Sequence, residues 1–501
     1  MKRSSGILMP ISSLPSPYGI GTLGKEAREF IDFLSESGQS WWQILPVGPT
    51  SYGDSPYQCP STFAGNPYFI DPDTLEAEGL LTRSEIEAAD CGADPERADY
   101  GLLYERRGPL LRKAAERGLK EPDEAFMAFK EENSSWLPDY CLFSALKAKF
   151  GQKSWLDWPD EAARNRDPEA LEGFRTELAP EIEICAYIQY LFFRQWDALR
   201  EYAREKGIGI IGDLPIYVAL DSADVWSEKE FFQIGEDGVP EKVAGVPPDY
   251  FNEDGQLWGN PLYDYGRMKE DGWGWWIRRI GGAAKLYDVI RIDHFRGFES
   301  YWAVPYGDTT AKNGEWIKGP GMELVGALRD WFKDTSFIAE DLGYPTPEVK
   351  QLLEDSGFPG MKVVEFAFDP GLESSDMPHR YGTRCVCYTG THDNPPVMAW
   401  KETAPAEEIE IAREYLGLND AEGFAFGMIR GGMASTAELF IAQMQDWLQL
   451  GTSSRMNTPG ILGGNWQWRM LPGALTDELA RRIARMTQLY GRSNENVWSK
   501  P

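Results

Sequence analysis

The sequence predicts an α/β protein of the (β/α)8 (TIM) barrel class, for three reasons. Short apolar runs rich in β-branched residues recur along the chain, helical patterns or long insertions separate them, and acidic residues stand at the ends of several. Continuous apolar runs are typical of parallel strands buried on both faces, and eight such strands close a barrel. The 501 residues fit one barrel with insertions, and no separate C-terminal β-sandwich domain is expected.

The expected strands follow one another along the chain. Seven apolar runs are assigned to residues 6–11, 42–45, 208–214, 288–293, 337–340, 362–368 and 384–388, and an eighth strand is expected near residues 453–457. Between the first two, residues 25–37 carry apolar side chains at helical spacing and precede Gly38, a stop signal, which predicts a helix. This strand, helix and strand form the first unit of the barrel.

The remaining chain is assigned to insertions into a single barrel domain that spans residues 1–501. Residues 72–195 are rich in charge, show helical periodicity and are too long for a simple connection, so a helical subdomain is expected after the second strand. Residues 215–285 contain many Gly, Pro, Trp and Tyr residues, which indicates a loop-rich insertion after the third strand. A further helical insertion is expected at residues 395–450, after the seventh strand.

The composition excludes several classes of partner. Fifty Lys and Arg residues against 79 Asp and Glu residues give a net charge of −29, which argues against binding to nucleic acid or to an acidic membrane. Prolines interrupt the short apolar stretch near the N-terminus before it could form a signal peptide. We therefore expect a cytoplasmic protein, or a plastid one whose transit peptide has been removed, and no obligate protein partner is evident.

Two motifs resemble cofactor sites, but their context does not support that interpretation. Residues 19–24 (GIGTLG) match the G-x-G-x-x-G pattern, yet prolines separate them from the first strand and no acidic residue ends the second. Residues 252–255 (NEDG) resemble part of a calcium loop, but Tyr250 and Pro261 occupy its first and twelfth ligand positions. The six cysteines form no C-x-x-C pair. Neither a cofactor nor a metal is therefore expected.

The segment RIDHFRG, residues 291–297, is the first that indicates chemistry. Alternation along a strand places Arg291 and Asp293 on one face. A guanidinium beside the Asp293 carboxyl would lower its pKa and hold it ionised, as a covalent nucleophile requires. A purely structural pair of Arg and Asp is the alternative.

Two further strands also end in acidic residues. Glu340 lies in SFIAEDLG and Asp393 in THDN, and both Asp293 and Asp393 neighbour a histidine in a chain that has only three. The carboxyl ends of barrel strands meet at one mouth, so the three carboxylates are expected to converge. Two carboxylates at suitable separation break glycosidic bonds. Glu365 and Asp341 are interpreted as structural.

Other residues suit a sugar site, although each alone is more often part of a turn or a core. Asp213 lies at the end of the third strand, Ser55 and Tyr57 lie in the loop after the second, and Gln256 and Trp258 supply an amide and a ring. Aromatic rings offer flat apolar faces to the C–H faces of sugars.

These motifs resemble a known family. The segments IRIDHFRG, IAEDLG and THDN look like the catalytic regions of the α-amylase clan. The longer segments SSGILMPISSLPSPYGIGTLG, WWQILPVGPTSYGDSPYQCPSTFAGNPYFID, PPDYFNEDGQLWGNPLYDY and GFPGMKVVEFAF are similar, more narrowly, to the 4-α-glucanotransferases of glycoside hydrolase family 77, also called amylomaltases. The resemblance runs from near residue 5 to about residue 470.

The resemblance implies a retaining transfer of α-1,4-glucan segments between malto-oligosaccharides, amylose or glycogen-type glucans. Asp293 would be the nucleophile, Glu340 the acid and then the base, and Asp393 the residue that stabilises the oxocarbenium-like state. Arg291 would orient Asp293, and the resemblance assigns substrate contacts to His294, His392, Asp213, Tyr57, Ser55, Gln256, Trp258 and Asn457. Residues 249–255 and the stretch RMNTPGILGGNWQWR would form cleft loops. A hydrolase of the same clan and a non-catalytic glucan-binding protein are the alternatives.

Overall fold

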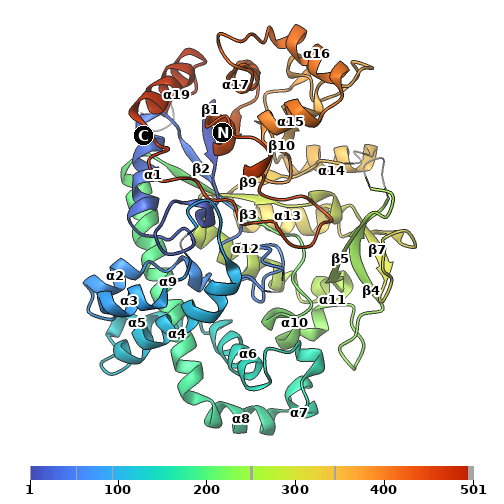
Figure 1. Ribbon diagram of the computed structural model, residues 1–501. Coiled ribbons are helices and arrows are strands. Elements are labelled where there is room, and N and C mark those ends of the chain that lie inside the picture. The colour runs from blue at the N-terminus through green and yellow to red at the C-terminus, as the bar shows by residue number, and fades with distance from the viewer. Residues whose placement is uncertain (1, 52, 93, 249–251, 344–345, 495–501) are drawn as a thin grey trace.

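The computed structural model describes residues 2–51, 53–92, 94–248, 252–343 and 346–494. At its centre lies a barrel of parallel strands (Figure 1), eight in number. The strands lie in the order β10, β11, β12, β1, β2, β3, β6, β9. Their bounds are β1 Ser4–Leu8, β2 Trp41–Gln43, β3 Gly209–Leu214, β6 Val289–Ile292, β9 Ser336–Ala339, β10 Gly360–Val363, β11 Cys385–Tyr388 and β12 Leu439–Gln443. The predicted barrel class is confirmed.

The last gap in the barrel, between β9 and β10, is closed by single hydrogen bonds rather than by a paired ladder. The N–H of Ala339 donates to the carbonyl of Pro359 at 2.9 Å, and the N–H of Met361 donates to the Asp341 carboxylate at 2.7 Å. A Cβ atom at position 360 would lie 2.8 Å from both Asp341 carboxylate oxygens, so Gly360 is needed there. Asp341 therefore has the structural role that its sequence position predicts.

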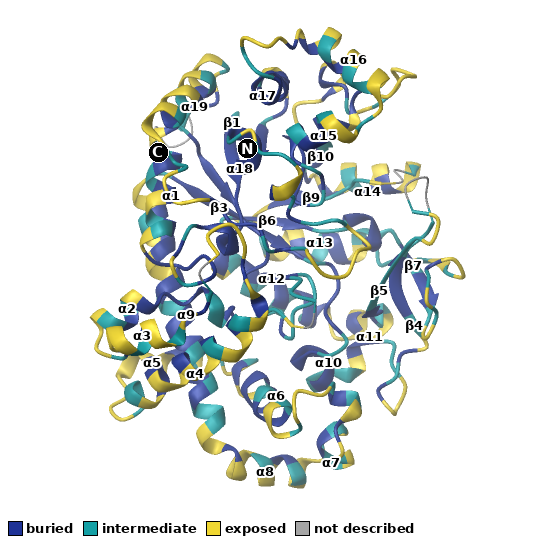
Figure 2. Cartoon of the chain, viewed as in Figure 1, coloured by how far each residue is buried: buried dark blue, intermediate teal, exposed yellow. Residues whose placement is uncertain are grey.

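Helices surround the barrel, with their exposed residues facing outward (Figure 2). The outer layer includes α1 Lys25–Glu36, α12 Gly274–Leu286, α13 Met322–Trp331, α14 Pro347–Ser356, α17 Phe424–Ala434 and α19 Asp477–Leu489. The predicted apolar face of α1 is buried through Ala27, Phe30, Ile31 and Leu34. None of the described helices is both long and apolar enough to cross a membrane.

A group of helices stands between β2 and β3, where a helical subdomain is expected. They are α2 Pro72–Ala77, α3 Arg83–Ala89, α4 Tyr100–Gly118, α5 Glu124–Glu132, α6 Leu137–Lys149, α7 Glu161–Arg164, α8 Pro168–Glu177 and α9 Ala179–Glu205. Several begin at an Asp whose side chain accepts a first-turn N–H, as Asp71, Asp99 and Asp123 do. The long helix α9 contacts α4, α5, α6, α8 and the barrel strand β3, and so links the group to the barrel.

The segment after β3 contains more regular structure than its composition suggests. It holds α10 Ala223–Ser227, β4 Lys242–Val246, β5 Gln256–Pro261 and α11 Tyr265–Glu270. With β7 Ser300–Pro305 and β8 Glu315–Lys318, β4 and β5 form an antiparallel sheet in the order β5, β4, β7, β8. This second sheet was not predicted, because its strands come from segments on either side of β6.

Two strand assignments were wrong. The eighth barrel strand is β12, Leu439–Gln443, and not residues 453–457, which begin inside the short 3-10 helix η8 Thr452–Ser454 and continue past its end. This strand lies inside the range 395–450 that was expected to be helical, after α15 Val397–Thr403, α16 Ala406–Leu416 and α17 and before α18 Met444–Trp447. The strand expected at 362–368 ends at Val363, where the turn η6 Val364–Phe366 begins.

The glycines of residues 19–24 serve close packing. A Cβ atom at Gly21 would lie 1.7 Å from the carbonyl oxygen of Ile11, and one at Gly24 would lie 2.3 Å from the carboxyl carbon of Asp71. The N–H of Leu23 also donates to the carbonyl of Phe69 at 2.8 Å. The glycine spacing is therefore explained by the close approach of the Ile11 backbone to Gly21 and of the Asp71 side chain to Gly24.

Candidate active site

The predicted carboxylates lie at the carboxyl ends of the barrel strands. Asp293 follows β6 and Glu340 follows β9, and these strands are neighbours whose last paired residues are Ile292 and Ala339. Asp393 lies in the loop after β11. Together with Asp213, at the end of β3, the Glu340 and Asp393 carboxylates act electrostatically on Asp293. The expected convergence of these side chains is thus present in the structure.

A chain of hydrogen bonds connects Asp293 to the loop after β2. Nη1 of Arg291 donates to Oδ1 of Asp293 at 3.0 Å and to both carboxylate oxygens of Asp213 at 2.6 and 2.7 Å. The hydroxyl of Tyr57 donates to Oδ2 of Asp213 at 2.6 Å. The Arg291 and Asp213 side chains are 3% and 0% exposed, whereas Asp293 is 25% exposed. Only Asp293 in this carboxylate pair is open to a substrate.

The pKa of Asp293 differs from the sequence-based expectation. Burial raises this pKa well above its usual value, the Arg291 guanidinium opposes the rise, and the carboxylates of Asp213, Glu340 and Asp393 add to it. The prediction of a lowered pKa considered Arg291 alone. Because Arg291 is shared with Asp213, one positive charge faces several negative ones.

Glu340 is held by backbone donors. Its Oε2 accepts the N–H of His294 at 2.8 Å, and its Oε1 accepts the N–H of Leu342 at 2.7 Å. His294 adopts a left-handed backbone with φ of 48°, which is uncommon for a residue other than glycine. Burial raises the pKa of Glu340 to about 6, while Arg291 and the two N–H groups oppose the rise. Such a carboxyl can both give and take a proton near neutral pH.

Asp393 is more open than Asp293, with 42% of its side chain exposed against 25%. Its Oδ1 accepts a hydrogen bond from Nδ2 of Asn457 at 2.6 Å and lies 3.4 Å from Nε2 of His392. Burial lowers the pKa of His392, although Asp393 opposes this, and burial lowers the pKa of His294 to about 3. Both imidazoles are therefore neutral near pH 7 and can each donate one N–H.

Aromatic rings line the same end of the barrel. The Tyr57 ring stacks on His392 at 5.2 Å between centroids, and the Trp466 ring packs against both, at 5.7 and 5.9 Å. The Trp258 ring meets the His294 ring edge to face at 4.8 Å. Trp466 was not predicted as a site residue, and its only signal was its place in the stretch RMNTPGILGGNWQWR.

The remaining predicted binding residues make local contacts. The side-chain oxygen of Gln256 accepts the indole N–H of Trp258 at 3.2 Å, and the hydroxyl of Ser55 accepts the N–H of Tyr57 at 3.2 Å. Residues 249–251 of the predicted cleft loop lie outside the described residues.

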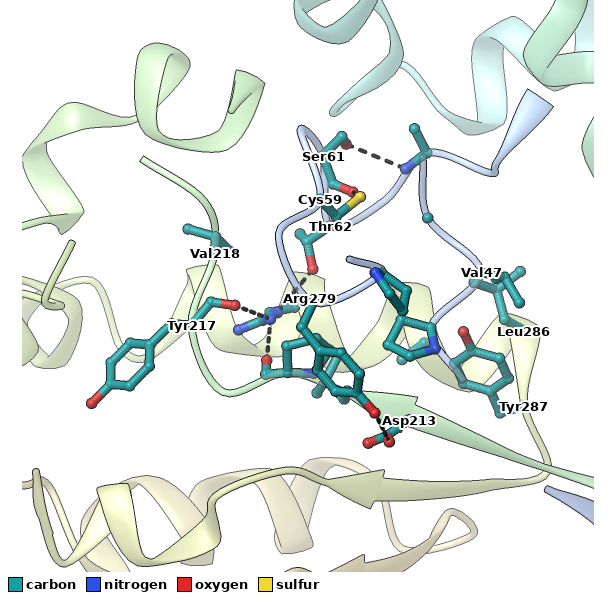
Figure 3. A pocket seen from close by; sticks show the side chains of 18 residues that line it. Val47, Cys59, Ser61, Thr62, Asp213, Tyr217, Val218, Arg279, Leu286 and Tyr287 are labelled. Atoms are coloured by element: carbon teal, nitrogen blue, oxygen red, sulfur yellow. Dashed lines mark hydrogen bonds between the residues drawn. The ribbon is translucent and has the colours of Figure 1, made fainter. Parts of the chain in front are cut away.

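Arg279 of α12 joins the loop after β2 to the segment after β3, as the dashed lines in Figure 3 show. Its Nη1 donates to the carbonyl of Ile216 at 2.8 Å, its Nη2 to the carbonyl of Tyr217 at 3.3 Å, and its Nε to the hydroxyl of Thr62 at 2.9 Å. The segment after β3 is thereby tied to the loop that carries Tyr57. Sequence reasoning missed Arg279, because it lies on a helix remote from any motif.

Comparison with known proteins agrees with this geometry. The family model described as 4-alpha-glucanotransferase matches residues 9–475. The 4-alpha-glucanotransferase of Clostridium butyricum is 49% identical over 97% of this chain and 100% of its own length, and that of Thermus thermophilus is 46% identical over 98% and 99%. An amylomaltase from Streptococcus agalactiae, solved in complex with acarbose, is 43% identical and superimposes with a TM-score of 0.96, covering 98% of this chain and 100% of the other. The chain therefore belongs to the 4-alpha-glucanotransferases of glycoside hydrolase family 77.

Proposed function

We propose that this 4-alpha-glucanotransferase moves α-1,4-glucan segments between malto-oligosaccharides, amylose or glycogen-type glucans by a retaining double displacement. The observation that carries the proposal is the meeting of Asp293, Glu340 and Asp393 at the carboxyl ends of the barrel strands. Two carboxylates on opposite sides of a glycosidic bond are the machinery of retaining glycosidases.

In the first step, the Asp293 carboxylate attacks the anomeric carbon of the donor. The bond from that carbon to the glycosidic oxygen breaks as Glu340 gives its proton to this oxygen, and the shortened glucan leaves. In the second step, the Glu340 carboxylate takes the proton from the 4-hydroxyl of an acceptor glucan. That oxygen attacks the anomeric carbon, the ester to Asp293 breaks, and a new α-1,4 bond forms.

The other side chains support these steps. Asp393 would hold sugar hydroxyls as the ring flattens, and the neutral His294 and His392 would donate to hydroxyls of the same ring. The burial of Asp213 indicates that it acts through Arg291 and Tyr57, its two hydrogen-bond partners. Flanking glucose units would contact the Tyr57 and Trp258 rings and the side chains of Ser55, Gln256 and Asn457.

Transfer competes with hydrolysis, the reaction of the alternative clan enzyme. Water is present at about 55 M, but a well-oriented acceptor can reach an effective molarity of about 10⁵ M or more. With pure maltotriose, we expect glucose to appear together with longer chains while the total of reducing ends stays constant. Reducing ends that rise in step with glucose would show a hydrolase instead, and an unchanged sugar profile would show a non-catalytic binding protein.

The pH profile tests the acid role of Glu340. The protonated form is the active one in the first step, so kcat/KM for maltotriose should fall above about pH 6, the pKa of Glu340, by about tenfold per pH unit. With α-maltosyl fluoride, whose leaving group needs little protonation, this alkaline limb should largely disappear from kcat/KM. Equal alkaline limbs for the two donors would contradict the assignment.

We also propose a cytoplasmic or plastid location, without nucleic acid, membrane or an obligate protein partner. The net charge of −29 supports the exclusion of polyanions. Fractionation of the source cells, with activity on maltotriose as the assay, tests the location.

A further inference from the structure

Arg455 links the two segments that meet at Asp393. Its Nη2 donates to the backbone carbonyl of Asp393 at 2.8 Å, and its Nε donates to the backbone carbonyl of Asn457 at 2.8 Å. The guanidinium is a rigid planar fork, so two bonds to two carbonyls fix both the distance and the angle between those segments.

The same two segments carry the contact that orients the Asp393 carboxylate. Nδ2 of Asn457 donates to Oδ1 of Asp393 at 2.6 Å, and the N–H of Asn457 donates to the carbonyl of His392 at 3.2 Å. By holding the backbones of Asp393 and Asn457 together, Arg455 thus stabilises the hydrogen bond that the Asn457 side chain makes to the Asp393 carboxylate. These two bonds of Arg455 go to carbonyl oxygens and leave the Asp393 carboxylate available to a sugar.

The environment of Arg455 suits a fixed position. Its side chain is half-buried. The carboxylate of Glu365, 3% exposed, acts on Arg455 from the barrel, and Asp393 acts on it from the site. Both carboxyl oxygens of Glu365 are without a hydrogen-bond partner among the described residues. Arg455 is therefore under the electrostatic influence of both a buried acidic side chain and the more exposed Asp393.

We propose that Arg455 is a positioning residue for glucan transfer, which sets the direction of the Asp393 carboxylate by clamping the Asp393 and Asn457 backbones together. The inference rests on the proposed role of Asp393. Arg455 does not touch the sugar in this scheme. Because Asp393 acts on the flattened ring, its misplacement should lower kcat and leave KM nearly unchanged.

The variant Arg455→Met tests this, since it keeps an unbranched stem and removes every donor. We expect kcat for maltotriose disproportionation to fall by about 100-fold, the effect of a misplacement of about 1 Å, with KM within threefold of wild type. Arg455→Lys should also lose most of kcat, because one ammonium group does not reproduce the fork. Inhibition by acarbose, whose flattened ring resembles the reacting sugar, should weaken in parallel with kcat/KM.

Arg3 supplies a matched control. Its guanidinium also donates to carbonyls of separate segments, at Ser435, Met433 and Tyr490, but it precedes β1 at the opposite end of the barrel. Arg3→Met should lose thermal stability to a similar extent and keep the wild-type kcat. If Arg455→Met fails to fold, Arg455→Lys carries the same test.

A double variant and a parallel variant separate the outcomes. The double variant Arg455→Met with Asn457→Ala should have a kcat within threefold of that of the less active single variant, because both substitutions act on one contact. Unchanged kcat in Arg455→Met, full kcat in Arg455→Lys, or additive losses would overturn the positioning role. Asp393→Asn is measured alongside: if it keeps its activity, the proposed role of Asp393 fails, whereas an inactive Asp393→Asn beside a fully active Arg455→Met refutes only the role of Arg455.

Discussion

Replacing Asp293 with alanine is expected to lower kcat for maltotriose disproportionation by about 10⁵-fold, the scale of loss when a nucleophile is removed. Neither Asp213 nor Glu340 can take its place, because Asp213 is fully buried beneath Arg291 and Glu340 is held by two backbone N–H groups. Chromatography of the oligosaccharides at increasing enzyme concentration measures the residual rate.

Azide identifies the face of the donor sugar ring from which Asp293 attacks. With α-maltosyl fluoride as donor, azide can enter the space vacated in Asp293→Ala, and attack from that side inverts the anomeric carbon to give β-maltosyl azide. Formation of α-maltosyl azide by this variant would place the nucleophile elsewhere.

Stability provides the control for folding. Burial and three negative neighbours raise the pKa of Asp293, so its ionised form destabilises the folded state at pH 7, where the unfolded residue is fully ionised. Asp293→Asn should therefore unfold at a higher temperature than wild type near pH 7, and this gain should shrink as the pH falls towards the ordinary pKa of an aspartate. Inactivity combined with a lower unfolding temperature would point to misfolding.

The parts of the fold that local pattern determines were predictable. β3, β6 and β11 are fully buried, so their sequences are mostly apolar, and the acidic residues near or beyond their carboxyl ends stand out. β12 was missed because its five residues, LFIAQ, follow a glycine- and methionine-rich helix without a turn signal that separates the two. The antiparallel sheet was missed because β4 pairs with β7, and the barrel strand β6 separates these two strands in the sequence.

The site shows the same division between local and distant effects. Alternation placed Arg291 and Asp293 on one face, but the pKa of Asp293 depends on carboxylates from three other strands, which no local pattern reveals. The backbone N–H that His294 donates to Glu340 accompanies a left-handed conformation of His294, which no sequence pattern predicts. The sequence therefore indicated the groups that we propose to react, and the structure adds the contacts that hold them.

Replacing Glu340 with glutamine should separate the two steps of transfer. The amide cannot protonate the leaving oxygen, so kcat for maltotriose should fall by about 10³ to 10⁴-fold, the range of general acid–base catalysis. With α-maltosyl fluoride the first step needs little acid and should continue, whereas the second step lacks its base. A maltosyl ester should therefore accumulate on Asp293, visible as one added maltosyl unit in the intact mass and located by peptide mapping.

Asp341→Asn is the matched control, because the neighbouring side chain accepts a hydrogen bond from Met361 in the barrel wall, and an amide oxygen can still accept it. This variant should keep the wild-type kcat with both donors and form no adduct. Azide, which needs no base, should release the ester of a Glu340→Ala variant as α-maltosyl azide, the opposite anomer to that from Asp293→Ala. If Glu340→Gln turned over maltotriose and the fluoride with equal losses and no adduct, Glu340 would be a structural carboxylate, and the proton donor would have to be sought among other residues near the three strand ends.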